Sequence, residues 1–178
     1  QREVGLGTFD STGTFTLSLA EARRKLQQFQ LTSLEQAVLK LIQGAVRLEP
    51  AAIWMESTDR GFTIYWADPK EELQAQHFAG EFERVLLGPD SSAKDIAIGL
   101  MGFLDKEPAQ VWWAQWHGSE IVETVSLFGG QKQAHLHSPP DVHQRTFALA
   151  LEAGSQKLRV DRQVVATRTL FAPVLILW

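Results

Sequence analysis

The sequence contains no cysteine, which excludes disulfide bonds, thiolate catalysis and thiolate zinc sites together. It has no uninterrupted apolar run near the ~20 residues that a membrane-spanning helix needs, and no signal peptide is visible. Basic residues are not in excess, because 17 Lys and Arg stand against 21 Asp and Glu, for a formal charge of −4. That balance lacks the electrostatic footprint of a nucleic-acid partner. We expect a cytoplasmic protein that binds neither membrane nor nucleic acid; the oligomeric state stays open.

The residues that are present describe an ordinary globular domain. A length of 178 residues, with 44% hydrophobic and 21% charged residues, fits one domain with a single core. The chain begins with Gln1 and an apolar stretch runs directly into Trp178. From these two ends we expect residues 1–178 to form one domain cut from a longer protein.

Helical periodicity recurs along the chain. Ser33 precedes one such stretch, and Gln36 follows three residues later as a capping-box partner. Another helical pattern runs to about Leu170 and is stopped by Pro173. The predicted helices cover residues 18–29, 33–48, 68–74 (a short acidic helix), 93–104 and the stretch before 170.

Alternating apolar residues predict strands between these helices. Residues 52–57 and 62–67 form a hairpin around the turn at 58–61. Four further segments are separated by turn signals and indicate an antiparallel meander. With a first strand at 13–17 and a last one after Pro173, the order predicts an α+β two-layer sandwich. Its sheet is expected to be mostly antiparallel, with seven or eight strands and helices on one face. The four meander segments are residues 109–117, 119–128, 132–138 and 144–152.

This order resembles the ATP-binding domain of the GHKL (Bergerat-fold) ATPase superfamily, and the helix, proline and strand at the end resemble its HtpG-type heat-shock chaperones. Residues 40–48 (Lys-Leu-Ile-Gln-Gly-Ala-Val-Arg-Leu) look like the helix motif Glu-Leu-x-x-Asn-Ala-x-Asp-Ala. Residues 60–73 are similar to the hairpin that leads into Asp-x-Gly-x-Gly. Residues 96–100 stand where the family has a Gly-x-Gly turn, and 146–151 resemble a later strand that begins with threonine.

The resemblance implies a site whose helix motif has lost its chemistry. The family's general-base glutamate matches Lys40, which is protonated at neutral pH and cannot accept a proton. The asparagine that holds magnesium matches Gly44, which offers the cation no ligand. An aspartate near the end of the motif matches Arg47, a reversal of charge. Because Lys40 and Arg47 share a helical face, any nucleotide bound there is expected to bind without the metal.

The adenine side of the implied site is altered as well. The aspartate that reads the adenine amino group matches Trp66, which donates a hydrogen bond but cannot accept one. Asp68 lies nearby and would substitute only after a register shift. Of the Gly-x-Gly pair only Gly99 remains, and Thr146 keeps the threonine near the adenine. We expect bulky side chains, Trp66 first among them, to fill the space of the adenine.

These replacements favour a non-catalytic, pseudo-ATPase module with no cofactor and no metal, acting through a protein partner or further domains of its own chain. One alternative is a nucleotide binder with an altered pocket, which holds ATP without hydrolysis and uses Asp68 and Thr146. A third reading is a small-ligand domain in the remodelled cavity.

Histidines and tryptophans offer two further possibilities. His135 and His137 share a face of a predicted strand and His143 follows, but a metal site needs more ligands than these. A surface or partly buried structural role is therefore favoured. Trp112 and Trp116 share one face of their strand and Trp113 takes the other. Stacking on a ligand or partner is conceivable, and filling the core between sheet and helices is favoured.

Overall fold

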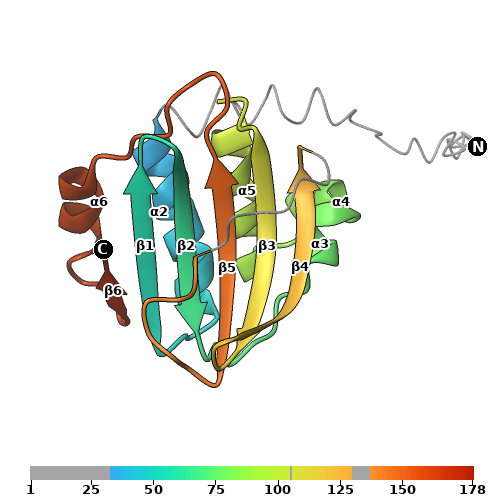
Figure 1. The fold of residues 1–178 in the computed structure, drawn as a ribbon, viewed down its shortest axis with the longest axis vertical. Helices are drawn as coiled ribbons and strands as arrows, with labels where there is room; N and C mark the ends of the chain where they lie inside the picture. Colours follow the sequence, from blue (N-terminus) through green and yellow to red (C-terminus); the bar gives the residue numbers. More distant parts are fainter. Residues whose placement is uncertain (1–32, 105, 130–136) are drawn as a thin grey trace, which may run out of the picture.

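A computed structural model of the chain describes residues 33–104, 106–129 and 137–178. Within them a single six-stranded sheet has the order β4-β3-β5-β2-β1-β6 (Figure 1). All neighbouring strands are antiparallel except β1 and β6, which run parallel. The strands are β1 (Ala52–Thr58), β2 (Gly61–Ala67), β3 (Gln110–His117), β4 (Glu120–Phe128), β5 (Arg145–Glu152) and β6 (Leu175–Leu177).

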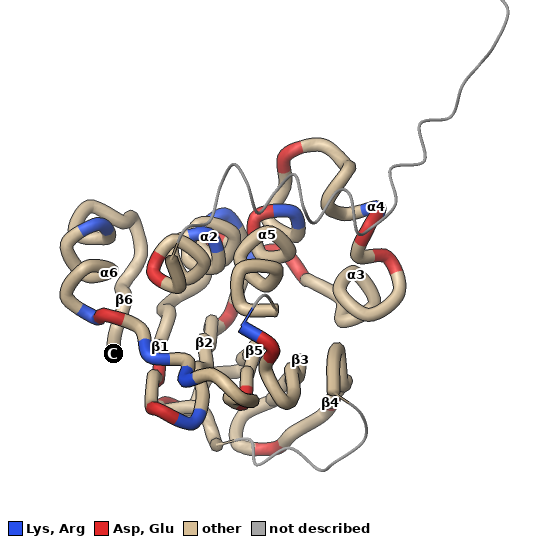
Figure 2. Tube along the Cα trace, turned by 90° about the horizontal axis from the view of Figure 1, so that it is seen from above, with Lys and Arg blue, Asp and Glu red and all other residues tan. Residues whose placement is uncertain are grey.

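The helices form a second layer on one face of this sheet, as the view from above shows (Figure 2). The two longest, α2 and α5, pack against each other over the middle strands. None of the described helices is long and apolar enough to cross a bilayer. The helices are α2 (Leu34–Arg47), α3 (Gln76–Ala79), α4 (Phe82–Leu87), α5 (Ser92–Leu104) and α6 (Arg162–Thr169).

The main core lies between the two layers and follows from strand alternation. In β2, the side chains of Phe62, Ile64 and Trp66 belong to the cluster that the helices cover. The helix α2 begins at its predicted cap, because Ser33 Oγ accepts a hydrogen bond from the Gln36 N–H at 3.4 Å. The sequence pattern therefore set both the buried face of the strand and the start of the helix.

The opposite face of the sheet carries a smaller buried cluster. Trp54, Tyr65 and Trp116 belong to it, packed with alanines from four strands. Residues 137–144 lie against this cluster, since the Tyr65 hydroxyl donates to the His137 carbonyl (3.3 Å) and the Trp54 and His143 rings lie 5.2 Å apart. Burial, with the nearby charge of Glu56, raises the pKa of Tyr65 far above its usual range. This cluster is thus covered by residues 137–144 and not by a helix.

The α+β two-layer prediction is confirmed, with two local corrections. Residues 68–74 are not helical; the short helix begins at Gln76, because Asp68 has φ 43° and its N–H donates to the Arg145 carbonyl. The predicted meander is wrong, because β5 pairs with β3 and β2. Strand 13–17, helix 18–29 and most of segment 132–138 lie outside the described residues, so the count of seven or eight strands stays a prediction.

Candidate functional site

Helix α2 contacts α5 through two glycines. A Cβ atom at Gly44 would lie 2.5 Å from Ile96 Cγ1 and 2.7 Å from the Ser92 carbonyl oxygen. A Cβ atom at Gly99 would lie 2.8 Å from the Ala37 carbonyl oxygen. Each glycine is therefore required by the close approach of the other helix's backbone. At position 44, where the resemblance implies a metal-holding asparagine, there is no room for a side chain.

The two cations predicted on α2 meet a carboxylate from α5. Lys40 Nζ lies 3.2 Å from Asp95 Oδ1, and Arg47 Nε lies 3.0 Å from Oδ2. The lysine contact is also a hydrogen bond. The arginine contact is an ion pair only, because Oδ2 accepts no hydrogen bond. Asp95 is only 6% exposed, so two partly exposed cations pair with one buried carboxylate.

Trp66 lies in the core on the helix side of the sheet. It is 1% exposed, its ring is 5.4 Å from that of Trp113, and it stacks on Phe147 at 6.4 Å between centroids. Its indole N–H has no hydrogen-bond partner. The side chain thus fills interior volume and makes no hydrogen bond.

Asp68 and Thr146 lie apart from these residues. The Asp68 carboxylate accepts from the Arg145 N–H at 2.8 Å and lies 3.0 Å from His143 Nδ1, so both oxygens are engaged by the end of the 137–144 segment and the start of β5. Thr146 is fully buried and its hydroxyl has no hydrogen-bond partner. It is paired with Ala67 and Trp116, on the face opposite Trp66.

The seven predicted positions therefore separate into groups. Lys40, Gly44 and Arg47 share the face of α2 that contacts α5, where Gly99 also lies. Trp66 is in the helix-side core. Asp68 is at a strand end and Thr146 is on the other face of the sheet. Whether these positions descend from a nucleotide pocket stays a prediction.

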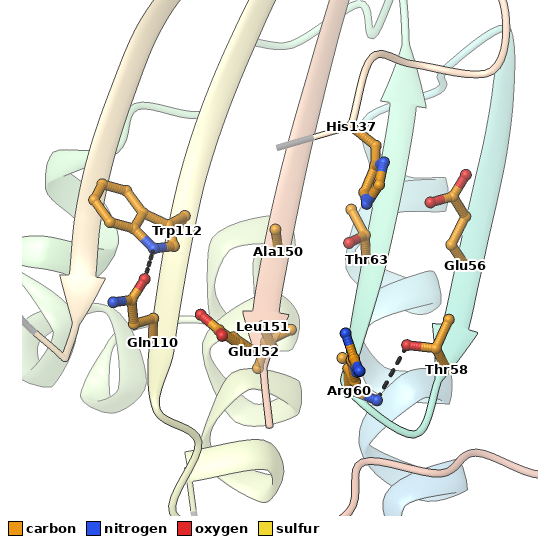
Figure 3. A pocket seen from close by; sticks show the side chains of 11 residues that line it. Glu56, Thr58, Arg60, Thr63, Gln110, Trp112, His137, Ala150, Leu151 and Glu152 are labelled. Carbon is orange, nitrogen blue, oxygen red and sulfur yellow. Dashed lines mark hydrogen bonds between the residues drawn. The ribbon is translucent and has the colours of Figure 1, made fainter. Parts of the chain in front are cut away.

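An open groove lies on the sheet face away from the helices, and the sequence patterns did not reveal it. Its volume is about 310 Å³. Strand register aligns Glu56, Thr63, Ala150 and Trp112 in one row across four strands. The neighbouring row consists of Thr58, Gly61, Glu152 and Gln110. Gly61, Thr63 and Ala150 form the floor, and the longer side chains of the two rows stand around it (Figure 3).

Trp112 and Trp116 share one face of β3 and Trp113 takes the other, as predicted. Trp113 fills the core between sheet and helices as favoured, but Trp116 is buried on the opposite face and Trp112 lines the groove. His137 lies at the groove, and His135 lies outside the described residues. Among the residues that the structure describes, no three His, Asp or Glu side chains are grouped to hold a metal ion.

Comparison with known proteins gives one kind of likeness. No protein family matches the chain, and no curated protein matches its sequence. Among solved structures, the chain is similar to the B-subunit of the DNA gyrase from Myxococcus xanthus, with a TM-score of 0.55 and 15% identity. The match covers 84% of this chain and 48% of that one, so the chain spans about half the length of the gyrase subunit. The fold is thus similar to the GHKL fold of gyrase B.

Proposed function

We propose that this chain is a non-catalytic, GHKL-like module, a pseudo-ATPase that acts through protein contacts within a larger protein or complex. The observation that carries the proposal is the direct contact of α2 with α5. The three positions that the resemblance assigns to the base, the metal ligand and the closing aspartate all lie in that contact. Gly44 has no room for a side chain, and Lys40 and Arg47 point to Asp95.

The charges at this contact argue in the same direction. Lys40 and Arg47 both pair with Asp95, so each cation would have to leave this carboxylate to bind a phosphate group. Lys40 at the base position carries a proton and cannot activate water. Trp66 occupies buried volume where the resemblance expects an aspartate that would read adenine. The positions that the resemblance assigns to the base, the metal ligand and the adenine reader therefore hold groups suited to another role.

The finer resemblance to HtpG-type chaperones rests on the end of the chain. There α6 is followed by Pro173 and by β6, which joins the sheet parallel to β1. A cytoplasmic location and a partner among proteins or neighbouring domains belong to the same proposal. The altered nucleotide binder is the alternative that the experiment below separates.

Calorimetric titration with ATP and ADP, with and without magnesium, tests the proposal together with an assay of phosphate release. We expect no saturable heat at millimolar nucleotide and no turnover above background. Lys40→Ala and the surface control Lys106→Ala distinguish the outcomes. Metal-free nucleotide binding that Lys40→Ala weakens and Lys106→Ala does not would establish the altered binder. Turnover lost in Lys40→Ala would overturn both readings.

A further inference from the structure

The groove on the open face of the sheet is lined by charged side chains. The side chains of Glu56, Glu152 and Arg60 make no ion pair or hydrogen bond with the residues that the structure describes. This contrasts with Asp95 on the helix side, which holds two cations. Two carboxylates and one guanidinium leave the groove with a net negative charge.

The fourth functional group of the groove is an aromatic surface. Trp112 is half-buried, and its indole N–H donates to Gln110 Oε1 at 2.9 Å (Figure 3). Gln110 is itself 6% exposed, so the hydrogen bond holds the indole in a fixed orientation. An indole face of this kind attracts a Lys or Arg side chain, and a nearby carboxylate strengthens the attraction. Strand register places Glu152 opposite Gln110, beside Trp112.

The spacing of the carboxylates matches an extended chain. Glu56 and Glu152 are two strands apart and two residues out of register, which puts their Cα atoms about 12 Å apart. Residues i and i+4 of an extended peptide lie about 13 Å apart, on the same side of the chain. Two cationic side chains at that interval can reach both carboxylates at once.

We propose that this groove binds an extended basic segment of a protein partner, with one Lys or Arg side chain between Trp112 and Glu152 and a second on Glu56. The inference rests on the proposed function, because it names the partner chemistry of a module that acts by protein contact. Charge selects this occupant, since the free carboxylates repel phosphate groups, carboxylate ligands and acidic segments. The small residues Gly61, Thr63 and Ala150 leave room for the peptide backbone above the floor.

The test uses the whole 178-residue chain and an acetylated, amidated nonapeptide with arginines at its third and seventh positions and Ser, Gly or Ala elsewhere. Titration followed by calorimetry is expected to give saturable binding that weakens as salt is raised. The same peptide with glutamates in place of both arginines is expected not to bind. Absence of binding by the arginine peptide at millimolar concentration overturns the proposal.

Substitutions locate the binding. Glu152→Gln and Glu56→Gln are each expected to weaken it about two- to fivefold, the range for a solvent-accessible ion pair. Arg60→Gln is expected to strengthen it, because a repelling cation is removed. The control Glu83→Gln removes one exposed carboxylate from α4, in the other layer, and should leave the affinity unchanged. If Glu152→Gln and Glu83→Gln weaken binding equally, the peptide responds only to the net charge of the protein, and the proposed binding in the groove is wrong.

The nucleotide titration separates this inference from the function on which it rests. If neither ATP nor the arginine peptide binds, the proposal of peptide binding in the groove is wrong and the pseudo-ATPase proposal is retained. If ATP binds and is hydrolysed, the pseudo-ATPase fails whatever the peptide does.

Discussion

The two faces of the sheet treat charge in opposite ways. On the helix side, Asp95 is buried and holds both Lys40 and Arg47, and Gly44 lets the two helices meet without a gap. On the open side, Glu56, Glu152 and Arg60 have no partner among the described residues and line a groove of about 310 Å³. The family resemblance directs attention to the first face. The charged side chains that line the groove lie on the second face.

The difference teaches which face of the sheet is built for stability and which is open to binding. A layer contact that is closed by glycines and ion pairs is suited to stability, because the helices pack closely and their opposite charges attract. A sheet face with small residues on its floor, and with charges that have no partner among the described residues, is suited to binding. The following changes are ordered from the largest expected effect on the free energy of unfolding to the smallest.

Trp66→Ala should have the largest effect, because it empties a fully packed position in the helix-side core. Loss of a buried Trp side chain costs about 3–5 kcal/mol through lost burial and the cavity left behind. Trp66→Phe is the matched control; it keeps an aromatic ring and removes an N–H that has no partner, so it should cost much less. Urea denaturation measures both. A loss of less than about 1 kcal/mol in the free energy of unfolding of Trp66→Ala would mean that the indole does not fill a packed core position.

Gly44→Asn restores the residue type that the resemblance assigns to the metal-holding position. Because a side chain there meets Ile96 and the Ser92 carbonyl, we expect a loss of about 1–3 kcal/mol from overpacking. Gly80→Ala is the control, since its Cβ would have only one neighbour, at 3.9 Å, and should change stability by less than about 0.5 kcal/mol. Thermal denaturation compares the two. A Gly44→Asn protein as stable as the parent would show that α2 and α5 leave space for a ligand.

Asp95→Ala removes the carboxylate that joins the two helices. A fully buried ion pair costs about 3–5 kcal/mol when one partner is removed. Lys40 and Arg47 can turn to water, since their side chains are 30% and 40% exposed, so about 1–2 kcal/mol is expected here. Asp90→Ala breaks an exposed pair with Lys94 and should cost about 0–1 kcal/mol. Equal losses in denaturant would place the Asp95 pairs at the surface.

Glu152→Gln should have the smallest effect on folding. Its carboxylate has no partner among the described residues, so its charge can be removed within about 0.5 kcal/mol of the parent stability. The same denaturation experiment checks this. A large loss would reveal an ion pair that holds the sheet together and would weaken the case for a binding role. Unchanged stability also makes the peptide titrations with this variant directly interpretable.

Much of the fold was readable from periodicity and caps. Ser33 and the apolar stripe after it gave α2, and alternation gave β2 with Trp66 on its buried face. The helix prediction at 68–74 was wrong because Asp68 has a positive φ and contacts Arg145 and His143. A local sequence pattern does not show either feature. The pairing of β5 with both β3 and β2 was not predicted, because turn signals do not specify which strands pair.

The site was only partly predictable. Lys40 and Arg47 could be placed on one helical face from their seven-residue interval, but their common partner Asp95 is distant in the sequence. The groove depends on four strands in register, so Glu56 and Glu152 line the same groove only in the folded sheet. Trp112 gave the one signal available, because its alternation with Trp113 put it on the other face.

An amide chemical-shift map by NMR compares both faces in one measurement. The account predicts that the arginine nonapeptide shifts signals of β1, β2, β3 and β5 around Glu56, Thr63, Trp112 and Glu152, with none in α2. It predicts that ATP with magnesium shifts no signal near Lys40, Gly44 or Asp95. Saturable shifts from ATP along the contact of α2 with α5, with an unmoved groove in the presence of the peptide, would contradict it.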